Sequence, residues 1–273
     1  MDVHGVTLVV GAGSGIGLET ALTFAERGAQ VVVFADLNFP AASEASEKSK
    51  SIATAANYRT LAIAVDVRDR TSVKAMVDTV KNQFSRIDYA INTAGIPLQN
   101  ESNTQSVTDS HYDALHDVNA KGILHCLQEE ILAMKDQEPA YVEGRNGRRS
   151  IGRGSIISVT SLSSVVGSPN SIPYTASKFA ARGIIKTAAI ENMRNNIRIN
   201  EVCPGYTDTP LMRTAMEFKP VIADILSKAM PLGRAAAPEE IANVIHFLAG
   251  PGASFVNGQT VVVDSGVSIT VGG

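Results

Sequence analysis

The chain has 273 residues, of which 44% are hydrophobic, and a formal net charge of −3. This length is enough for one large α/β domain with a substantial buried core. The small negative charge excludes a general attraction to nucleic acid or anionic membranes, and no run reaches the ~18 apolar residues of a membrane span, so a small molecule is the expected partner.

The two cysteines, Cys126 and Cys203, lie far apart and form no C-x-x-C pair. This usage is typical of a reducing compartment, and both are expected to be small core residues. The first predicted strand begins within about six residues of Met1, which leaves no room for a signal or transit peptide. A cytoplasmic location is therefore expected.

A glycine-rich turn follows the first apolar run, 7–10, and precedes a helical pattern over 16–27. Its glycines are spaced G-x-x-x-G-x-G, at Gly11, Gly15 and Gly17, rather than G-x-G-x-x-G. Free backbone N–H groups and the positive end of the helix dipole can bind a pyrophosphate there, because no Cβ blocks its approach. An ordinary strand-to-helix turn is the alternative, so the rest of the chain must decide.

Continuous apolar runs and helix-like segments alternate along the rest of the sequence. The alternation predicts a Rossmann-like doubly wound, seven-stranded parallel sheet with helices on both faces, a single domain over 1–273, and ligands at the carboxyl ends of the strands. The strands are expected at 7–10, 31–34, 61–65, 88–92, 155–159, 197–202 and 260–263, and further helices at 41–56, 71–84, 109–136, 173–192 and 238–249.

Two segments interrupt this alternation. Residues 139–153 contain four arginines and three glycines and are interpreted as a solvated insertion, with no role in nucleic-acid binding. Residues 207–230 follow a strand and are predicted to form a mobile lid over the ligand site. The lid suggests a bulky apolar substrate, although simple packing explains the same side chains, which are Leu211, Met212, Met216, Phe218, Val221 and Ile222.

Asp36 ends the second predicted strand, 19 residues after Gly17. A carboxylate at this place can accept hydrogen bonds from the adenosine ribose and repels a 2′-phosphate. Positions 14 and 37 carry no arginine or lysine to offset that repulsion, so NAD is favoured over NADP. A solvated loop aspartate is the alternative.

Tyr174 and Lys178 lie four residues apart in a segment that Pro173 begins as a helix, so both project from one face. The ammonium group is expected to lower the pKa of the phenol toward a value useful for acid–base catalysis. Ser161, 13 residues before Tyr174, could polarise a substrate carbonyl, but spacing alone does not distinguish it from Ser163 or Ser164. Asn119 falls within a long helical segment, where a surface-facing polar residue is the simplest interpretation.

Together these features resemble the short-chain dehydrogenase/reductase family in its compact single-domain form, over nearly the whole chain. Thr93 stands where a second asparagine is usual and Asp264-Ser265-Gly266 replaces the usual Asp-Gly-Gly, but neither departure removes a catalytic group. Five motifs carry the resemblance: the glycine turn, Asn92-Thr93-Ala94-Gly95, Tyr174-x-x-x-Lys178, Pro204-Gly205 and Asn257-Gly258-Gln259.

The resemblance implies four catalytic residues and a nicotinamide cofactor. Tyr174 would exchange the proton of the carbinol oxygen, Ser161 would position that oxygen, Lys178 would bind the nicotinamide ribose and lower the pKa of the tyrosine, and Asn119 would anchor a water in a proton relay. The implied cofactor contacts are Gly11, Ser14, Gly15, Ile16, Gly17, Asp36, Asp66, Val67, Asn92, Ala94, Gly95, Tyr174, Lys178, Pro204, Gly205, Thr207 and Thr209.

The expected protein is thus an NAD-dependent enzyme that interconverts a secondary alcohol and a ketone on a bulky apolar substrate. It is expected to be a homodimer or homotetramer, because segments 109–136 and 173–192 are the family's usual contact helices. No metal is expected, because the five histidines form no ligand cluster. The main alternative is a cofactor-binding regulator or scaffold without turnover. An epimerase or dehydratase on a related fold would have glycines spaced G-x-x-G-x-x-G and usually a longer C-terminal region. A halohydrin-cleaving relative would usually have arginine in place of Lys178 and an altered glycine turn.

Overall fold

The computed structural model describes residues 3–98, 100, 103–218, 224 and 230–270. Seven parallel strands form one sheet in the order β3-β2-β1-β4-β7-β8-β9. The strands are β1 (Val6–Val10), β2 (Val31–Asp36), β3 (Arg59–Ala64), β4 (Tyr89–Asn92), β7 (Gly154–Val159), β8 (Ile197–Pro204) and β9 (Thr260–Val263). The predicted seven-stranded doubly wound fold is therefore confirmed.

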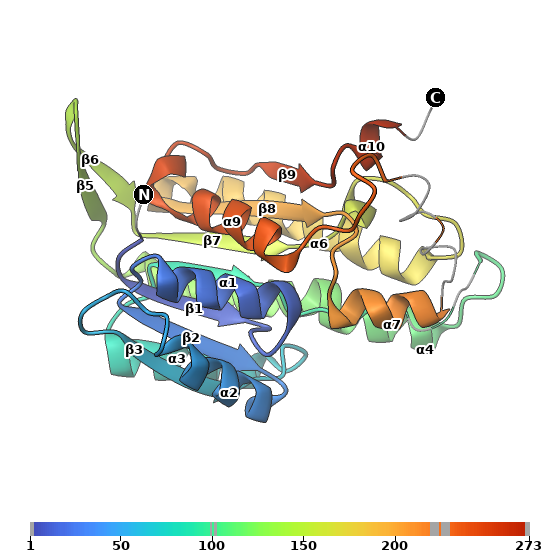
Figure 1. Cartoon of the computed structure of the whole chain (residues 1–273), viewed down its shortest axis with the longest axis horizontal. Coiled ribbons are helices and arrows are strands. Elements are labelled where there is room, and N and C mark those ends of the chain that lie inside the picture. Colours follow the sequence, from blue (N-terminus) through green and yellow to red (C-terminus); the bar gives the residue numbers. More distant parts are fainter. Residues whose placement is uncertain (1–2, 99, 101–102, 219–223, 225–229, 271–273) are drawn as a thin grey trace.

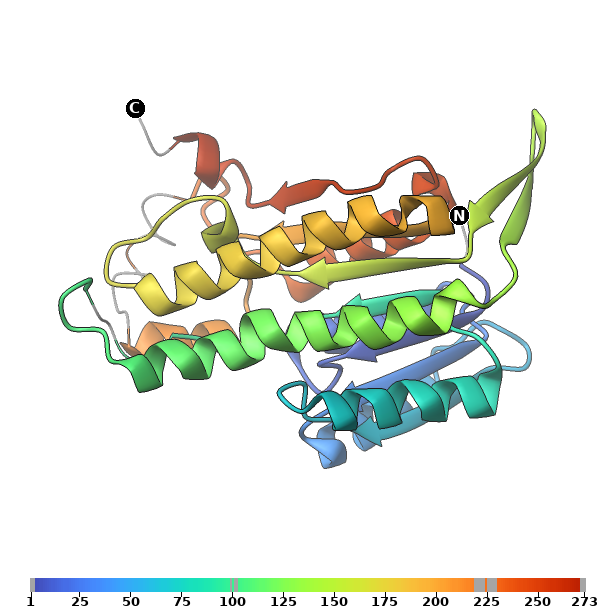
Figure 2. The ribbon, with the colours of Figure 1, turned by 180° about the vertical axis from the view of Figure 1, so that it is seen from behind.

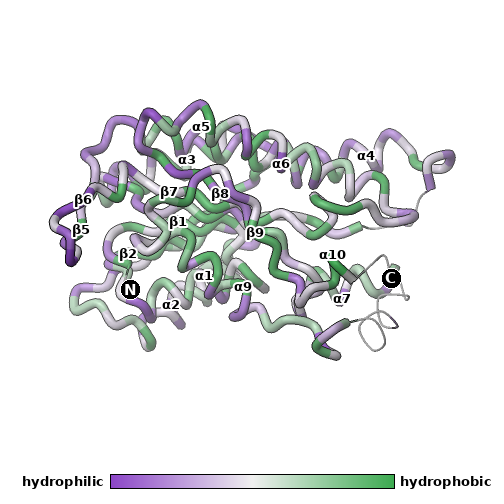
Figure 3. The backbone as a smooth tube through the Cα atoms, turned by 90° about the horizontal axis from the view of Figure 1, so that it is seen from above, coloured by the Kyte–Doolittle hydropathy of each residue, from purple (hydrophilic) through white to green (hydrophobic). Residues whose placement is uncertain are grey.

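Helices cover both faces of this sheet, so the molecule has three layers (Figure 3). One face packs against α3 (Arg70–Phe84), α5 (Gly122–Lys135) and α6 (Ile172–Asn192), with α4 (Asp109–His116) extending beyond the sheet. The other face packs against α1 (Gly15–Glu26), α2 (Phe39–Ser49) and α9 (Pro238–Ala249). The central strands β1, β2, β4 and β7 are buried along nearly their whole length, which explains why their residues are mostly apolar.

Strand β1 shows how one run supplies both cores. Val6, Leu8 and Val10 pack on the α3–α5–α6 side, whereas Val9 packs on the α1–α2–α9 side. The strand order reverses between β1 and β4, which are neighbours in the sheet. The chain therefore leaves a crevice at the carboxyl ends of these two strands, where open α/β sheets bind ligands.

The insertion predicted at 139–153 forms a two-stranded hairpin whose residues are mostly exposed. Strands β5 (Ala140–Gly144) and β6 (Gly147–Gly152) pair antiparallel and project from the body, far from α7 (Pro210–Phe218) (Figures 1 and 2). Arg148 lies over the Tyr141 ring at 4.3 Å, and Arg149 Nη2 donates to the Pro251 carbonyl at 3.0 Å. Asn146-Gly147 is a strong hairpin signal that composition alone does not reveal.

The long helix predicted over 109–136 is divided into α4, a π turn at Asp117–Lys121 and α5. The helix predicted over 41–56 is shorter, because α2 ends at Ser49. Among the described residues no helix is long and apolar enough to cross a membrane. The short elements η2 (Leu162–Ser164), η3 (Met193–Asn195), η4 (Pro251–Ala253) and α10 (Val267–Thr270) complete the described fold.

Candidate active site

A cavity of about 1340 Å³ opens at the carboxyl ends of the strands. It exceeds the ~300–1,000 Å³ that single drug-sized ligands occupy. Of the predicted site residues, Asn92 and Asn119 do not line it. Those that do are Gly11, Ser14, Gly15, Ile16, Gly17, Asp36, Asp66, Val67, Ala94, Gly95, Ser161, Tyr174, Lys178, Pro204, Gly205, Thr207 and Thr209.

The glycine turn between β1 and α1 is tightly folded. Gly11 has a φ of +89°, and its N–H donates to the Ala35 carbonyl at 2.7 Å. A Cβ on Gly17 would lie 2.0 Å from the Gly11 carbonyl oxygen, so only glycine fits there. The first turn of α1 follows with no acidic side chain, which leaves its N-terminus suited to an anion.

Asp36 is fixed against this turn. One carboxylate oxygen accepts from Gly13 N and the other from Asn38 N, both at 2.8 Å. These bonds orient the carboxylate at the cavity wall rather than leaving it as a solvated loop side chain. The turn, the carboxylate and the cavity volume together fit a dinucleotide.

Arg68 is a cavity residue that the sequence analysis missed. Its guanidinium pairs with Asp66 at 2.6 Å, and the hydrogen bond from Arg68 is the main reason that the pKa of Asp66 is lowered. The pair forms because both side chains follow β3 within three positions of each other. Arg68 is thus already engaged by a carboxylate.

Tyr174 and Lys178 project from the first two turns of α6 into the cavity. The Lys178 Nζ lies 5.6 Å from the centre of the Tyr174 ring, and the side chain of Ser161 hydrogen-bonds Tyr174. Ser161 also begins the short helix η2, because its Oγ accepts from Ser163 N at 3.1 Å. Ser161, which is 13 residues before Tyr174 in the sequence, therefore meets the tyrosine and the lysine at one place.

The acid–base properties of these groups differ from the sequence-based expectation. Desolvation raises the pKa of Tyr174, and the hydrogen bond from Ser161 only partly opposes it. Desolvation also lowers the pKa of Lys178 to about 8, against the effects of Cys203 and Glu201. The pKa of Tyr174 in this structure is therefore raised, and not lowered as expected, because the loss of hydration outweighs the hydrogen bond from Ser161.

Asn119 lies in the π turn and is fully buried, which corrects the surface-facing interpretation. Its Oδ1 accepts from Ile96 N at 2.9 Å, and its Nδ2 donates to Ile96 O and Ser177 Oγ, both at 3.2 Å. A Cβ on Gly95 would lie 3.1 Å from Asn119 Oδ1 and 3.5 Å from Lys178 Nζ. The amide therefore fixes the segment after β4 beside the lysine.

Asn92 lies beneath the cavity rather than in its wall. Its Nδ2 donates to Glu130 Oε2 on α5 at 2.9 Å, so it ties the sheet to that helix. Desolvation raises the pKa of the fully buried Glu130 to about 7. Next to Asn92, Thr93 Oγ1 donates to the Val10 carbonyl at 2.8 Å and connects β4 to β1.

The predicted lid at 207–230 falls only partly within the described residues. Helix α7 contributes Leu211, Met212 and Ala215 to the cavity wall, while 219–223 and 225–229, including Val221 and Ile222, lie outside the described residues. Within the described part of the chain, no group of three or more His, Cys, Asp and Glu could hold a metal ion.

Comparison with known proteins gives consistent relatives. A family model described as enoyl-(acyl carrier protein) reductase matches residues 11–268. The short-chain dehydrogenase anuF of Penicillium roqueforti is 39% identical over 271 residues, which cover 99% of this chain and 98% of that protein.

Two solved structures share the fold. Levodione reductase superposes with a TM-score of 0.83 at 30% identity, covering 97% of each chain. A 7α-hydroxysteroid dehydrogenase complexed with NADH and 7-oxo glycochenodeoxycholic acid superposes with a TM-score of 0.81 at 26% identity, covering 96% of this chain and 93% of that one. With its sheet, glycine turn and Ser161–Tyr174–Lys178 cluster, the chain belongs to the short-chain dehydrogenase/reductase family.

Proposed function

We propose that this protein is an NAD(H)-dependent oxidoreductase that interconverts a secondary alcohol and a ketone. The observation that carries the proposal is the meeting of Ser161, Tyr174 and Lys178 in the same cavity as the glycine turn, with Ser161 hydrogen-bonded to Tyr174. The glycine turn, Asp36 and the loop after β8 would hold the dinucleotide. A bound nicotinamide would supply the hydride donor or acceptor.

The chain's own residues would handle the proton and the oxygen. In alcohol oxidation the carbinol carbon loses a hydride and Tyr174 takes the hydroxyl proton, which leaves a ketone; in reduction the transfers reverse. The Ser161 hydroxyl would donate to the substrate oxygen and hold it beside Tyr174. Because desolvation raises the pKa of Tyr174, the phenol is protonated at neutral pH and ready to donate, and oxidation is expected to rise with pH.

Asp36 supports NAD rather than NADP. Its carboxylate is held at the cavity wall by two backbone N–H groups and would repel a 2′-phosphate. Arg68 is paired with Asp66 and so does not stand free to neutralise that phosphate.

A bulky apolar substrate is supported by the part of the cavity beyond Tyr174. Its wall is built from the segment after β4, the η2 region and α7, and the hydroxysteroid dehydrogenase with the same fold holds a large molecule, 7-oxo glycochenodeoxycholic acid. The apolar lining side chains are Ile96, Leu98, Leu162, Val166, Leu211 and Met212.

Self-association through α5 and α6, as a homodimer or homotetramer, is part of the same proposal. Large apolar side chains are exposed on these two helices, where a partner surface would cover them. They are Leu124, Leu132, Phe179 and Ile190.

The test is a panel of secondary alcohols and ketones of graded size, assayed with NAD(H) and NADP(H) by nicotinamide absorbance. Tyr174→Phe is expected to lower turnover more than about 100-fold and to leave NADH binding within about threefold. Tyr141→Phe, on the distant hairpin, is the matched control and should behave as wild type. Retention of more than about a tenth of the rate by Tyr174→Phe would remove this residue from the mechanism. NADH binding without turnover of any panel member would favour the regulator or scaffold.

A further inference from the structure

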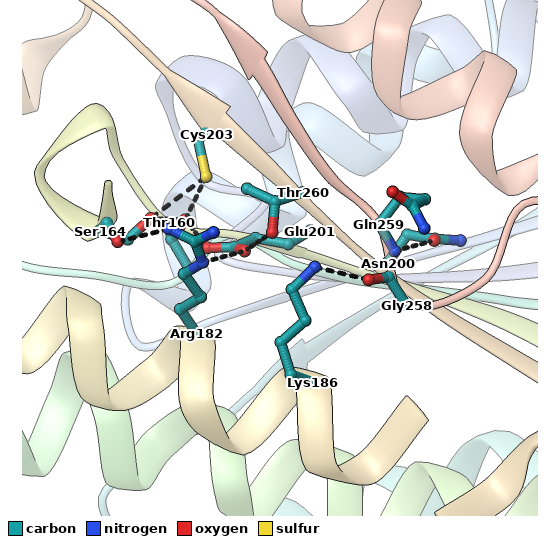
Figure 4. A network of polar contacts seen from close by, with 10 residues as sticks. All are labelled: Thr160, Ser164, Arg182, Lys186, Asn200, Glu201, Cys203, Gly258, Gln259 and Thr260. Atoms are coloured by element: carbon teal, nitrogen blue, oxygen red, sulfur yellow. Dashed lines mark hydrogen bonds and ion pairs between the residues drawn. The ribbon is translucent and has the colours of Figure 1, made fainter. Parts of the chain in front are cut away.

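A buried carboxylate lies directly behind the proposed catalytic residues. Glu201, on β8, has a fully buried side chain surrounded by hydroxyl groups (Figure 4). Its Oε1 accepts from Thr160 Oγ1 at 2.5 Å and from Ser164 Oγ at 3.0 Å, and its Oε2 accepts from Thr260 Oγ1 at 2.7 Å. Burying a carboxylate is costly unless donors surround it, and here they come from two segments of the chain, the turn at 160–164 and β9.

Two of these donors flank Ser161. Thr160 immediately precedes it, and Ser164 ends the short helix η2 that Ser161 begins. Because both hydroxyls reach the same carboxylate oxygen, the turn that carries Ser161 is closed around Glu201 (Figure 4). The position of the Ser161 hydroxyl relative to Tyr174 therefore depends on an acid that does not line the cavity.

The helix that carries Tyr174 and Lys178 is connected to the same acid. Arg182 follows Lys178 by four residues, on the same side of α6. Its Nη1 donates to the Ser164 carbonyl at 3.1 Å, and its Nε lies 3.9 Å from Glu201 Oε2. The serine turn and the tyrosine helix are thus joined through Arg182 and Glu201.

Glu201 also acts on the cavity through its charge. Desolvation lowers the pKa of Lys178, and the Glu201 carboxylate is one of the two groups that oppose this lowering. The other is Cys203, whose own pKa is raised to about 11 by desolvation, so that its thiol is neutral near pH 7. Glu201 therefore provides the standing negative charge of this pair.

We propose that Glu201 is a positioning residue, whose carboxylate fixes the Ser161 turn against Tyr174 through Thr160 and Ser164 and joins that turn to the tyrosine helix through Arg182. The proposal rests on the proposed function, in which Ser161, Tyr174 and Lys178 act on the substrate oxygen. Glu201 itself does not line the cavity.

The first experiment compares two threonines that bond the same carboxylate. Thr160→Val removes the bond beside Ser161, whereas Thr260→Val removes the bond to the far oxygen. Thr160→Val and Glu201→Gln are expected to lower kcat about 10- to 100-fold with KM within about threefold, since displacement of a reacting group by about 1 Å costs that much. Thr160→Ser should restore kcat, and Thr260→Val should stay within about twofold of wild type.

Two further measurements distinguish positioning from general damage. In Glu201→Gln the loss of a negative charge favours both the neutral amine and the phenolate, so the pH profile of kcat should move to lower pH by about 0.5 pH unit or more. A crystal structure of Glu201→Gln should show the Ser161–Tyr174 hydrogen bond lengthened or broken. If Glu201→Gln does not fold, the pH profile and the crystal structure are determined for Thr160→Val instead. The Ser161–Tyr174 hydrogen bond in that crystal structure is then the deciding measurement.

The proposal is overturned if the Ser161–Tyr174 bond is unchanged in the variants, or if Thr160→Val and Thr260→Val lose kcat equally at equal melting temperature. Absence of turnover by the wild-type protein on the alcohol and ketone panel would instead refute the proposed function. The crystal structures decide the role of Glu201 in either case, because they do not require turnover.

Discussion

Replacing Gly17 by alanine is expected to abolish tight dinucleotide binding while leaving the rest of the fold in place. The new Cβ would lie 2.0 Å from the Gly11 carbonyl oxygen and 2.4 Å from Thr93 Oγ1. The first neighbour is backbone, so no change of rotamer can relieve the contact. The Gly11 segment would have to move by more than about 1 Å to restore ordinary van der Waals separation.

That movement has a calculable cost. Gly11 N is bonded to Ala35 O at 2.7 Å, and shifting the segment loses most of this bond, worth about 1 kcal/mol. Overpacking adds about 1–3 kcal/mol. The displaced turn must return to its original shape to bind the cofactor, and this costs about 2–4 kcal/mol. NADH binding is therefore expected to weaken by about 30- to 1,000-fold.

The assay is a fluorescence titration with NADH, accompanied by thermal unfolding. Gly183→Ala is the matched control, since it sits within α6 and a Cβ added there would meet nothing within 4 Å. Alanine is the better helix former by about 1 kcal/mol, so this control should bind NADH normally and unfold at an equal or higher temperature. An NADH affinity of Gly17→Ala within about threefold of wild type would refute the steric reasoning.

Three other outcomes are expected. Asp36→Ala should narrow the preference for NAD(H) over NADP(H) by about tenfold or more in binding titrations, because a charge that repels the 2′-phosphate is removed; tighter binding of NADPH than NADH by the wild type would contradict this. Glu130 keeps its proton in the folded protein until about pH 7 but loses it near pH 4.5 when unfolded. As the pH rises between these values, the free energy of unfolding of the wild type should therefore fall by up to about 3 kcal/mol relative to that of Glu130→Gln. An equal pH dependence of the two free energies, measured by denaturant unfolding, would argue against this assignment. Replacing residues 140–152 with a short Gly-Ser linker should leave kcat and KM within about twofold, because the hairpin precedes β7 at the edge opposite the cavity; a tenfold loss of kcat at unchanged melting temperature would count against this placement.

The strand-and-helix alternation was sufficient to predict the seven-stranded sheet, because the central strands are buried on both faces and their runs are largely apolar. The glycine spacing, Asp36 and the Tyr174-x-x-x-Lys178 pair also reach the cavity as predicted. Ser161 could not be distinguished from its neighbouring serines by spacing. The hydrogen bond to Tyr174 distinguishes Ser161 from its neighbouring serines, and this bond depends on how β7 and α6 pack.

The features that escaped prediction depend on tertiary contacts. The burial of Asn119 follows from a π turn for which the local sequence offers no signal. The direction of the Tyr174 pKa depends on how much water the folded cavity removes, which no spacing reports. Glu201 lies in a strand that also carries Arg198 and Asn200, and its significance emerges only when Thr160 and Ser164 are seen at the same carboxylate oxygen.

The shape of part of this cavity depends on how many residues the π turn contains rather than on which residues they are. Gly122 N bonds Asp117 O, five residues earlier, so the turn accommodates one residue more than an α-helix would. Losing any one of the four residues there other than Asn119 would rotate α4 against α5 by about 100° and carry the Asn119 amide away from Ile96, although the Asn119 side chain would still be present. In a comparison of related chains, a one-residue gap between Asp117 and Lys121 would therefore be a stronger sign of altered chemistry than many substitutions elsewhere on these helices.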